Sequence, residues 1–136
     1  RPTVDDLSPV VSPEELRVVQ AVVRRTHVAD PVLDFALHIV RATRAHEAVR
    51  IGASSRAALA LVRCAQARSV LFDRDYVLPD DVKVLAPYVL GHRLVLARTA
   101  TTRGGSGAGQ FGIDQLGAGG AIVGEVLAAV PVPVRP

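Results

Sequence analysis

Apolar residues recur at helical spacing along the chain, and local start signals separate the segments. The first segment begins at Ser12, which can cap a helix, while Pro13 suits the first helical position and Glu15 can close a capping box. The pattern predicts a helix from residue 13 to about Arg25. Its expected apolar face carries Leu16, Val19, Val22 and Val23, opposite Arg17, Gln20 and Arg24.

A second helix is predicted from Asp30 to about Ala45, because Asp30-Pro31 repeats the start signal. Its expected apolar positions are Leu33, Ala36, Leu37 and Val40. His38 and His46 lie eight residues apart, whereas metal ligands on one helix usually lie three or four apart, and no Cys or carboxylate completes a set. We therefore predict solvated or locally bonded histidines and no metal site.

A short connection, HEAVRIG, leads to a third helix over residues 54–72, which is apolar on nearly all sides. Such a helix lies centrally in a bundle, and its narrow polar stripe, Arg56, Arg63 and Gln66, should face outward. Cys64 lies within the apolar pattern and is expected to be a small buried residue. As the only cysteine it excludes a disulfide within the chain and favours a reducing compartment.

A fourth helix is expected from Pro79, after a short extended entry at Tyr76-Val77. Asp80 and Asp81 suit the positive end of its dipole, although Leu78 is a poor cap. Pro87 removes a backbone donor, so a kink or a break is predicted there.

Glycine dominates the next segment, because nine of the eleven glycines lie between Gly104 and Gly124. The stretch GAGQFG, residues 107–112, matches G-x-G-x-x-G, but no strand–helix–strand unit surrounds it. We therefore expect a flexible loop over 99–120 rather than a phosphate cradle. A last helix is predicted over about 121–130. The fold class is all-α, a small bundle of four to five helices.

Composition narrows the chemistry further. The net charge is +3 with 15 arginines and one lysine, and these charges are interspersed with acids. Such a surface permits contact with phosphate and makes a nucleic-acid partner unlikely. No serine lies in a nucleophile elbow, Cys64 has no identifiable catalytic partner, and no apolar run is long enough to cross a bilayer.

Arg56 is the best candidate for a binding residue. It lies at the start of the third helix, in GASSRAAL, where the helix dipole disfavours a positive charge unless an anion is near. Free backbone N–H groups, the dipole and a guanidinium together suit a phosphate. The alternative at this point is an ordinary solvated charge.

The stretch from Arg50 to Leu96, RIGASSRAALALVRCAQARSVLFDRDYVLPDDVKVLAPYVLGHRLVL, resembles the C-terminal lid of MoxR-type AAA+ ATPases. It has the family's Gly-Ala-Ser-x-Arg-Ala opening, Asp-Tyr-Val-x-Pro-x-Asp-Val element, Leu-Ala-Pro and His-Arg-Leu. The likeness covers most of residues 5–98 and the C-terminal helix. It implies that Arg56 is the sensor-2 residue, which reaches the terminal phosphates of ATP. Ser54 and Ser55, at the same helix start, are further candidate nucleotide contacts.

The resemblance also implies an organisation and a set of partners. Residues 1–11 would be a linker from a missing N-terminal ATPase core, 12–98 the helical lid, 99–120 the loop, and 121–136 a C-terminal helix and tail. The parent would use ATP and Mg²⁺ and form a hexameric ring in the cytoplasm. It would act as a chaperone-like machine on other assemblies, with von Willebrand A-domain proteins among its partners.

Some features depart from the family. Ser55 stands where the family often has proline, and the glycine-rich stretch looks longer than usual. Walker A and Walker B motifs are absent, so the chain alone should not hydrolyse ATP. Two alternatives stay open. A small basic helical nucleic-acid-binding domain predicts tight, salt-dependent DNA binding. A purely structural interaction bundle predicts no effect of Arg56→Ala; Arg50 and Arg63 are candidate interdomain contacts only.

Overall fold

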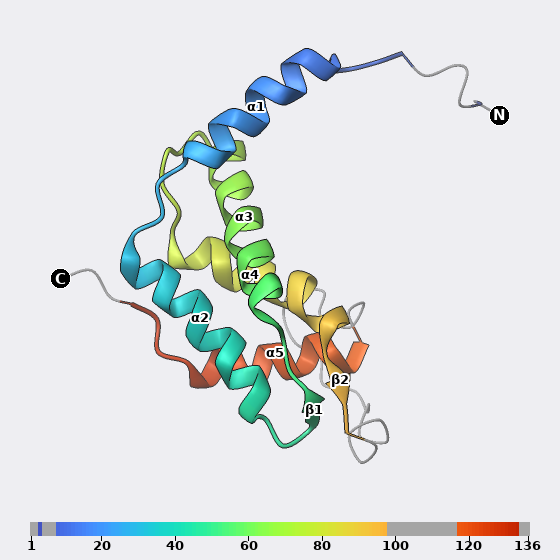
Figure 1. The fold of residues 1–136 in the computed structure, drawn as a ribbon, viewed down its shortest axis with the longest axis vertical. Helices are drawn as coiled ribbons and strands as arrows, with labels where there is room; N and C mark the ends of the chain where they lie inside the picture. The colour runs from blue at the N-terminus through green and yellow to red at the C-terminus, as the bar shows by residue number, and fades with distance from the viewer. Residues whose placement is uncertain (1–2, 4–7, 98–116, 134–136) are drawn as a thin grey trace.

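The computed structural model describes residues 3, 8–97 and 117–133 (Figure 1). Within this part of the chain the bundle contains five α-helices, a 3-10 turn and a two-stranded sheet, so the predicted all-α class is confirmed. The elements are α1 (Pro13–Arg25), α2 (Asp30–Ala45), β1 (Val49–Ile51), α3 (Ser55–Leu71), α4 (Pro79–Leu90), η2 (Gly91–Arg93), β2 (Val95–Leu96) and α5 (Gly117–Ala129).

The core lies where α2, α3, α4 and α5 meet, and α3 runs through the middle of the molecule (Figure 1). Its side chains are mostly aliphatic, as the scarcity of aromatic residues requires. The largest fully buried apolar side chains are Ile39, Leu61, Leu90, Val40, Val82 and Val123. The central position predicted for α3 is therefore confirmed.

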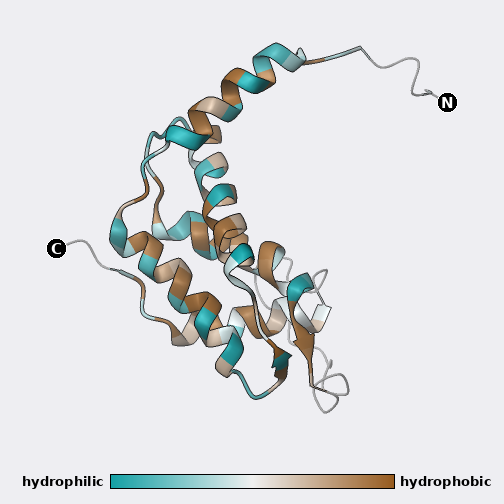
Figure 2. Cartoon of the chain, viewed as in Figure 1, coloured by the Kyte–Doolittle hydropathy of each residue, from teal (hydrophilic) through white to brown (hydrophobic). Residues whose placement is uncertain are grey.

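Helix α1 starts as its sequence predicts but does not join the core. Ser12 and Glu15 form the capping box, with Ser12 N–H donating to Glu15 Oε2 at 2.8 Å and Glu15 N–H donating to Ser12 Oγ at 3.2 Å. The bond from the Ser12 backbone also lowers the pKa of Glu15. No residue of α1 is buried, and the helix extends beyond the other helices with apolar residues on its surface (Figure 2). The apolar face predicted from the sequence therefore exists but is not buried in this structure.

A small antiparallel sheet lies beside the bundle and was not predicted. β1 pairs with β2, with Val49 opposite Leu96 and Ile51 opposite Val95. The segment HEAVRIG is thus partly a strand rather than a plain connection. The extended entry at Tyr76 is confirmed, because Tyr76 forms a parallel bridge with His27. β1 carries the chain from the end of α2 to the start of α3, and β2 follows α4 and η2.

Several side chains face differently from the sequence prediction. On α2, Leu37 is exposed while Val32, Phe35 and Ile39 are buried, so the core stripe is rotated. On α3, Gln66 is buried and donates to the Thr26 carbonyl oxygen at 2.8 Å. Cys64 is exposed. A helix that is apolar on nearly all sides leaves its faces undefined in the sequence, and tertiary packing decides them.

The C-terminal elements also differ in their boundaries. α4 continues through Pro87 to Leu90, so the helix does not break at this proline. α5 begins at Gly117, so the last four residues of the predicted loop are helical. The GAGQFG stretch and the remaining loop residues lie outside the described part of the chain. No helix among the described residues is long and apolar enough to cross a membrane.

Candidate phosphate-contact site at the start of α3

Arg56 is the second residue of α3, and the bundle leaves its side chain exposed. The next two residues, Ala57 and Ala58, are buried against the core, so the first turn of α3 has one face inside and one outside. Within the described segments, Arg56 forms no hydrogen bond or ion pair. Its guanidinium is therefore available to an anion from outside this domain.

Ser54 caps α3, and its hydroxyl oxygen accepts the Ala57 N–H at 3.3 Å. The Ser54 carbonyl oxygen also accepts the N–H groups of Ala57 and Ala58. The N–H groups of Ser55 and Arg56 have no acceptor in the described structure, as is usual for the first turn of a helix. The structure thus brings Ser54, Ser55 and Arg56 together at one helix end that offers donors and positive charge.

Gly52 allows the segment before α3 to lie against α2. A Cβ atom at this position would lie 2.5 Å from Arg44 Cγ and 2.7 Å from Arg44 Cα. Because one of these atoms is backbone, the segment would have to shift away from α2. The glycine of the Gly-Ala-Ser-x-Arg motif therefore serves close packing within the domain.

The other predicted candidates are spread over the surface. Arg50 on β1 and Arg63 on α3 are exposed, and the described structure gives neither an ion-pair partner. His38 bonds the Asp34 carbonyl oxygen at 2.8 Å, as predicted for a locally bonded histidine. His46 instead contacts Glu125 of α5, with Nε2 and Oε2 3.1 Å apart. The described residues contain no group of His, Cys, Asp or Glu that could hold a metal ion.

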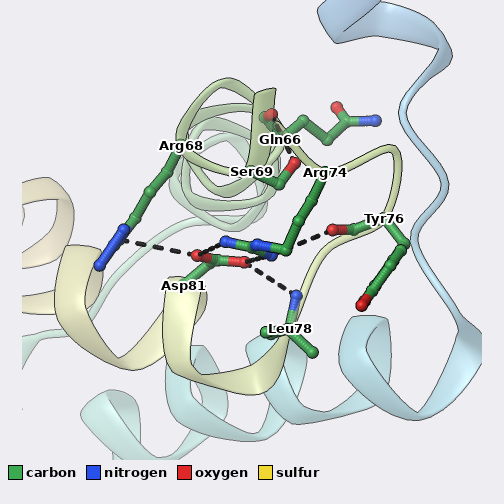
Figure 3. A network of polar contacts seen from close by, with 7 residues as sticks. All are labelled: Gln66, Arg68, Ser69, Arg74, Tyr76, Leu78 and Asp81. Carbon is green, nitrogen blue, oxygen red and sulfur yellow. Dashed lines mark hydrogen bonds and ion pairs between the residues drawn. The ribbon is translucent and has the colours of Figure 1, made fainter. Parts of the chain in front are cut away.

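A polar network at the other end of α3 was missed by the sequence prediction (Figure 3). Arg74 donates two bonds of 2.8 Å to the two carboxylate oxygens of Asp81, and Arg68 Nε lies 3.6 Å from Asp81 Oδ1. Leu78 N–H donates to Asp81 Oδ2 at 2.9 Å, so Asp81 supplies the cap that Leu78 cannot. The Arg68 guanidinium also lies over the Phe72 ring, 4.4 Å from its centroid.

The environment of Asp81 keeps it ionised. Burial raises the pKa of its carboxyl group, but the Arg74 hydrogen bonds, the Leu78 N–H bond and the charges of Arg74 and Arg68 together hold that pKa below its ordinary value. The same hydrogen bonds raise the pKa of Arg74. An acidic residue three positions into a helix, after a residue that cannot cap, is the sequence signal that could have indicated this role.

The chain is similar to a known domain family and to proteins of two bacteria. The family model described as AAA lid domain matches residues 41–110. The "Uncharacterized protein YeaC" of Bacillus subtilis is 36% identical over 132 residues, which cover 97% of this chain and 38% of that protein. "Chaperone MoxR1" of Mycobacterium tuberculosis is 34% identical over 100 residues, covering 67% of this chain and 26% of that protein.

A solved structure from Cytophaga hutchinsonii, described as a "putative ATPase", superposes with a TM-score of 0.78 at 25% identity. The superposed region covers 95% of this chain and 38% of the chain of that structure. The chain belongs to the AAA lid domain family. It is a lid of the type found in MoxR-like AAA+ ATPases. It spans well under half the length of the relatives it matches.

Proposed function

We propose that this lid contacts the terminal phosphates of ATP through Arg56 and couples nucleotide binding and hydrolysis to movement of a MoxR-like AAA+ ATPase. The observation that carries the proposal is an exposed arginine without a partner in the described structure, at the capped start of the most central helix. The position agrees with the sensor-2 arginine that the family resemblance implies.

The residues at this helix end suit a phosphate group. The Arg56 guanidinium and the Ser55 and Arg56 N–H groups supply positive charge and donors, and the helix dipole adds to both. The Ser55 hydroxyl is a further donor, whereas the Ser54 oxygen is already engaged in the cap. Mg²⁺ prefers carboxylate and phosphate oxygens, and the described residues gather no carboxylate cluster, so the rest of the parent would hold it.

During phosphoryl transfer, negative charge spreads over the transferred group and the leaving oxygen. A guanidinium placed there stabilises the transition state more than the ground state. The chain has no Walker A or Walker B motif, so the nucleotide-binding loop and the metal-binding carboxylate would come from the N-terminal core. Arg56 would then report from the lid whether a terminal phosphate is present.

The test is steady-state ATP hydrolysis by the full-length parent, with Arg56→Ala compared with the wild type and nucleotide binding measured alongside. We expect turnover to fall at least about tenfold, equivalent to roughly 1.4 kcal/mol of transition-state stabilisation. Arg41→Ala is the matched control, since Arg41 is an exposed arginine of α2 to which no role is assigned. Unchanged turnover in Arg56→Ala, with binding intact, would leave the domain as a structural bundle.

The exposed apolar face of α1 supports the N-terminal core as a partner. Leu16, Val19 and Val22 are 51%, 47% and 51% exposed, although their spacing forms one stripe. An amphipathic helix with an uncovered apolar stripe marks an interface. The relatives matched by this chain are more than twice its length, and in the proposed parent the core supplies the covering surface.

Val19→Ser should leave the unfolding of this chain nearly unchanged but lower the melting temperature of the full-length parent. The Val19 side chain is half exposed in this chain, so the substitution removes little buried apolar area. In the parent the core would cover the same valine, and the substitution would remove the stabilisation from that burial. Differential scanning calorimetry of both proteins measures the contrast. Equal shifts in the two proteins would contradict burial of α1 by the core.

The remaining partners rest on the family resemblance. Neighbouring subunits of a hexameric ring and von Willebrand A-domain proteins are the assemblies we propose for the parent, with the cytoplasm as its location. A nucleic-acid partner is not proposed, because the basic residues of the chain are interspersed with acidic ones and form no basic run.

A further inference from the structure

Two consecutive side chains at the end of α2 hold the segment from which α3 starts. The Thr43 hydroxyl oxygen accepts the Ala53 N–H at 3.0 Å. Arg44 Nε donates to the Ala53 carbonyl oxygen at 2.8 Å. Ala53 is fully buried, so its backbone groups depend on these partners rather than on water. Both polar backbone groups of a residue three positions before Arg56 are thus fixed to α2.

The Thr43 contact has a defined direction. Its hydroxyl proton is donated to the Val40 carbonyl oxygen at 2.7 Å. A hydroxyl has a single proton, so its oxygen meets Ala53 as an acceptor. Thr43 is itself fully buried, and no solvent competes for the bond. This side chain therefore fixes the Ala53 N–H in one arrangement.

Arg44 fixes the same segment by packing as well as by its bond. Its side chain and backbone lie where a Cβ atom on Gly52 would be, so Gly52 rests directly on Arg44. The Ser54 cap then carries the constraint into the first turn of α3 through Ala57 N–H. The contacts at Gly52, Ala53 and Ser54 form one continuous connection from α2 to the turn that holds Arg56.

We infer that Thr43 and Arg44 are positioning residues for Arg56. They hold the first turn of α3 on the end of α2, so that the guanidinium meets the phosphates from a fixed place. Helix ends fray readily, and Arg56 lies in the first turn. A misplacement of about 1 Å can cost a factor of about 10² in rate. The inference rests on the proposed role of Arg56 and adds the residues that make this role effective.

The test uses ATP hydrolysis by the full-length parent. Thr43→Val keeps the shape of the side chain but removes the acceptor, whereas Thr43→Ser keeps the hydroxyl. We expect Thr43→Val to lower kcat at least fivefold and Thr43→Ser to stay within twofold of the wild type. The double variant Thr43→Val/Arg56→Ala should be no slower than Arg56→Ala alone. Thr43 acts through Arg56 in this proposal, so both changes remove the same contribution of the guanidinium to kcat.

A second variant and a control separate positioning from stability. Arg44 is exposed, so Arg44→Lys should fold, yet it lacks a donor at the Nε position and should also lower kcat. Ser69→Ala removes another buried hydroxyl, at the far end of α3. The Ser69 hydroxyl donates to the Gln66 carbonyl oxygen at 2.8 Å. It should leave kcat unchanged. Hydrogen exchange in the parent should show faster exchange of residues 53–57 in Thr43→Val.

The outcomes distinguish the two proposals. If Arg56→Ala lowers turnover but its effect multiplies with that of Thr43→Val, the positioning role is overturned and the proposed function stands. A loss in Ser69→Ala equal to that in Thr43→Val, or unchanged exchange at residues 53–57, also overturns the positioning role. Unchanged turnover in Arg56→Ala overturns the proposed function, and the positioning role with it.

Discussion

Replacing Asp81 by alanine should lower the free energy of unfolding by about 3 kcal/mol, near the lower end of the range for breaking a buried ion pair. The Asp81 side chain is 3% exposed, and its removal leaves Arg74 and Arg68 without their anion and Leu78 N–H without its acceptor. The two arginines are 19% and 26% exposed, so water relieves part of the cost. Urea unfolding followed by circular dichroism measures the change.

Asp80→Ala is the matched control for this prediction. Asp80 is the preceding residue in the same helix turn, with a side chain 80% exposed and only a 4.0 Å contact to Lys83. Surface pairs of this kind contribute little, so the control should unfold like the wild type. Similar losses in both variants would show that the effect belongs to helix charge rather than to the buried network.

Acid should weaken the same network. The pKa of Asp81 is lower in the folded chain than in the unfolded chain, where the ordinary aspartate value of 3.8 applies. The folded state therefore binds fewer protons, and the stabilisation is complete above that pH. It is lost as the pH falls from there through the lower folded pKa. Asp81→Asn should flatten the decline of unfolding free energy in this window, and a decline as steep as in the wild type would assign it to other carboxylates.

Gly119→Ala is expected to destabilise the chain by about 2 kcal/mol. A Cβ atom on Gly119 would overlap the carbonyl oxygen of Gly91, and one on Gly91 would lie 2.9 Å from Gly120 N. The start of α5 thus lies directly on the turn after α4, backbone against backbone. Overpacking typically costs about 1–3 kcal/mol, and alanine returns about 1 kcal/mol of helix propensity. A clash with backbone belongs at the upper end of the overpacking range, since no side chain can move aside. Subtracting the gain in helix propensity leaves the expected net cost of about 2 kcal/mol.

Gly117→Ala provides the comparison, measured by the same urea titration. Nothing lies within 4 Å of a Cβ atom there, but the residue has φ of +62°. Only backbone strain applies, at a cost of about 1–2 kcal/mol. A stabilising effect of Gly119→Ala would contradict the close approach of α5 to η2.

Local sequence signals predicted the helices well. The boundaries of α1 and α2 agree with the predictions because Ser12, Glu15 and Asp30-Pro31 act within one helix turn. The sheet of β1 and β2 could not be found in this way. Its strands have three and two residues and lie more than 40 positions apart, so neither has a pattern of its own.

Burial was harder to predict than helicity. The stripe on α1 is as regular as those on buried helices, yet the structure of the described residues leaves none of its side chains buried. At the candidate site, too, one residue was predicted from the sequence and another was missed. Arg56 was predicted as a candidate from its position and its motif, and the structure leaves its side chain exposed; its role stays a prediction. Thr43 continues the buried stripe of α2 at Val40, and a hydroxyl on such a stripe was the available sign of a buried acceptor.

The length of α3 determines how far its second end moves when the helix rotates about its first end. With 17 residues the helix is about 25 Å long, and it has Arg56 at one end and the Asp81 network and α1 beside the other. Hydrogen bonds join the segment before α3 to α2 and join Gln66, near the other end of α3, to Thr26 after α1. A tilt of about 10° around the Arg56 end displaces the far end by about 4 Å over this length. In the proposed parent, a small rotation of α3 about its Arg56 end would therefore move the surface next to α1 by about the length of a side chain.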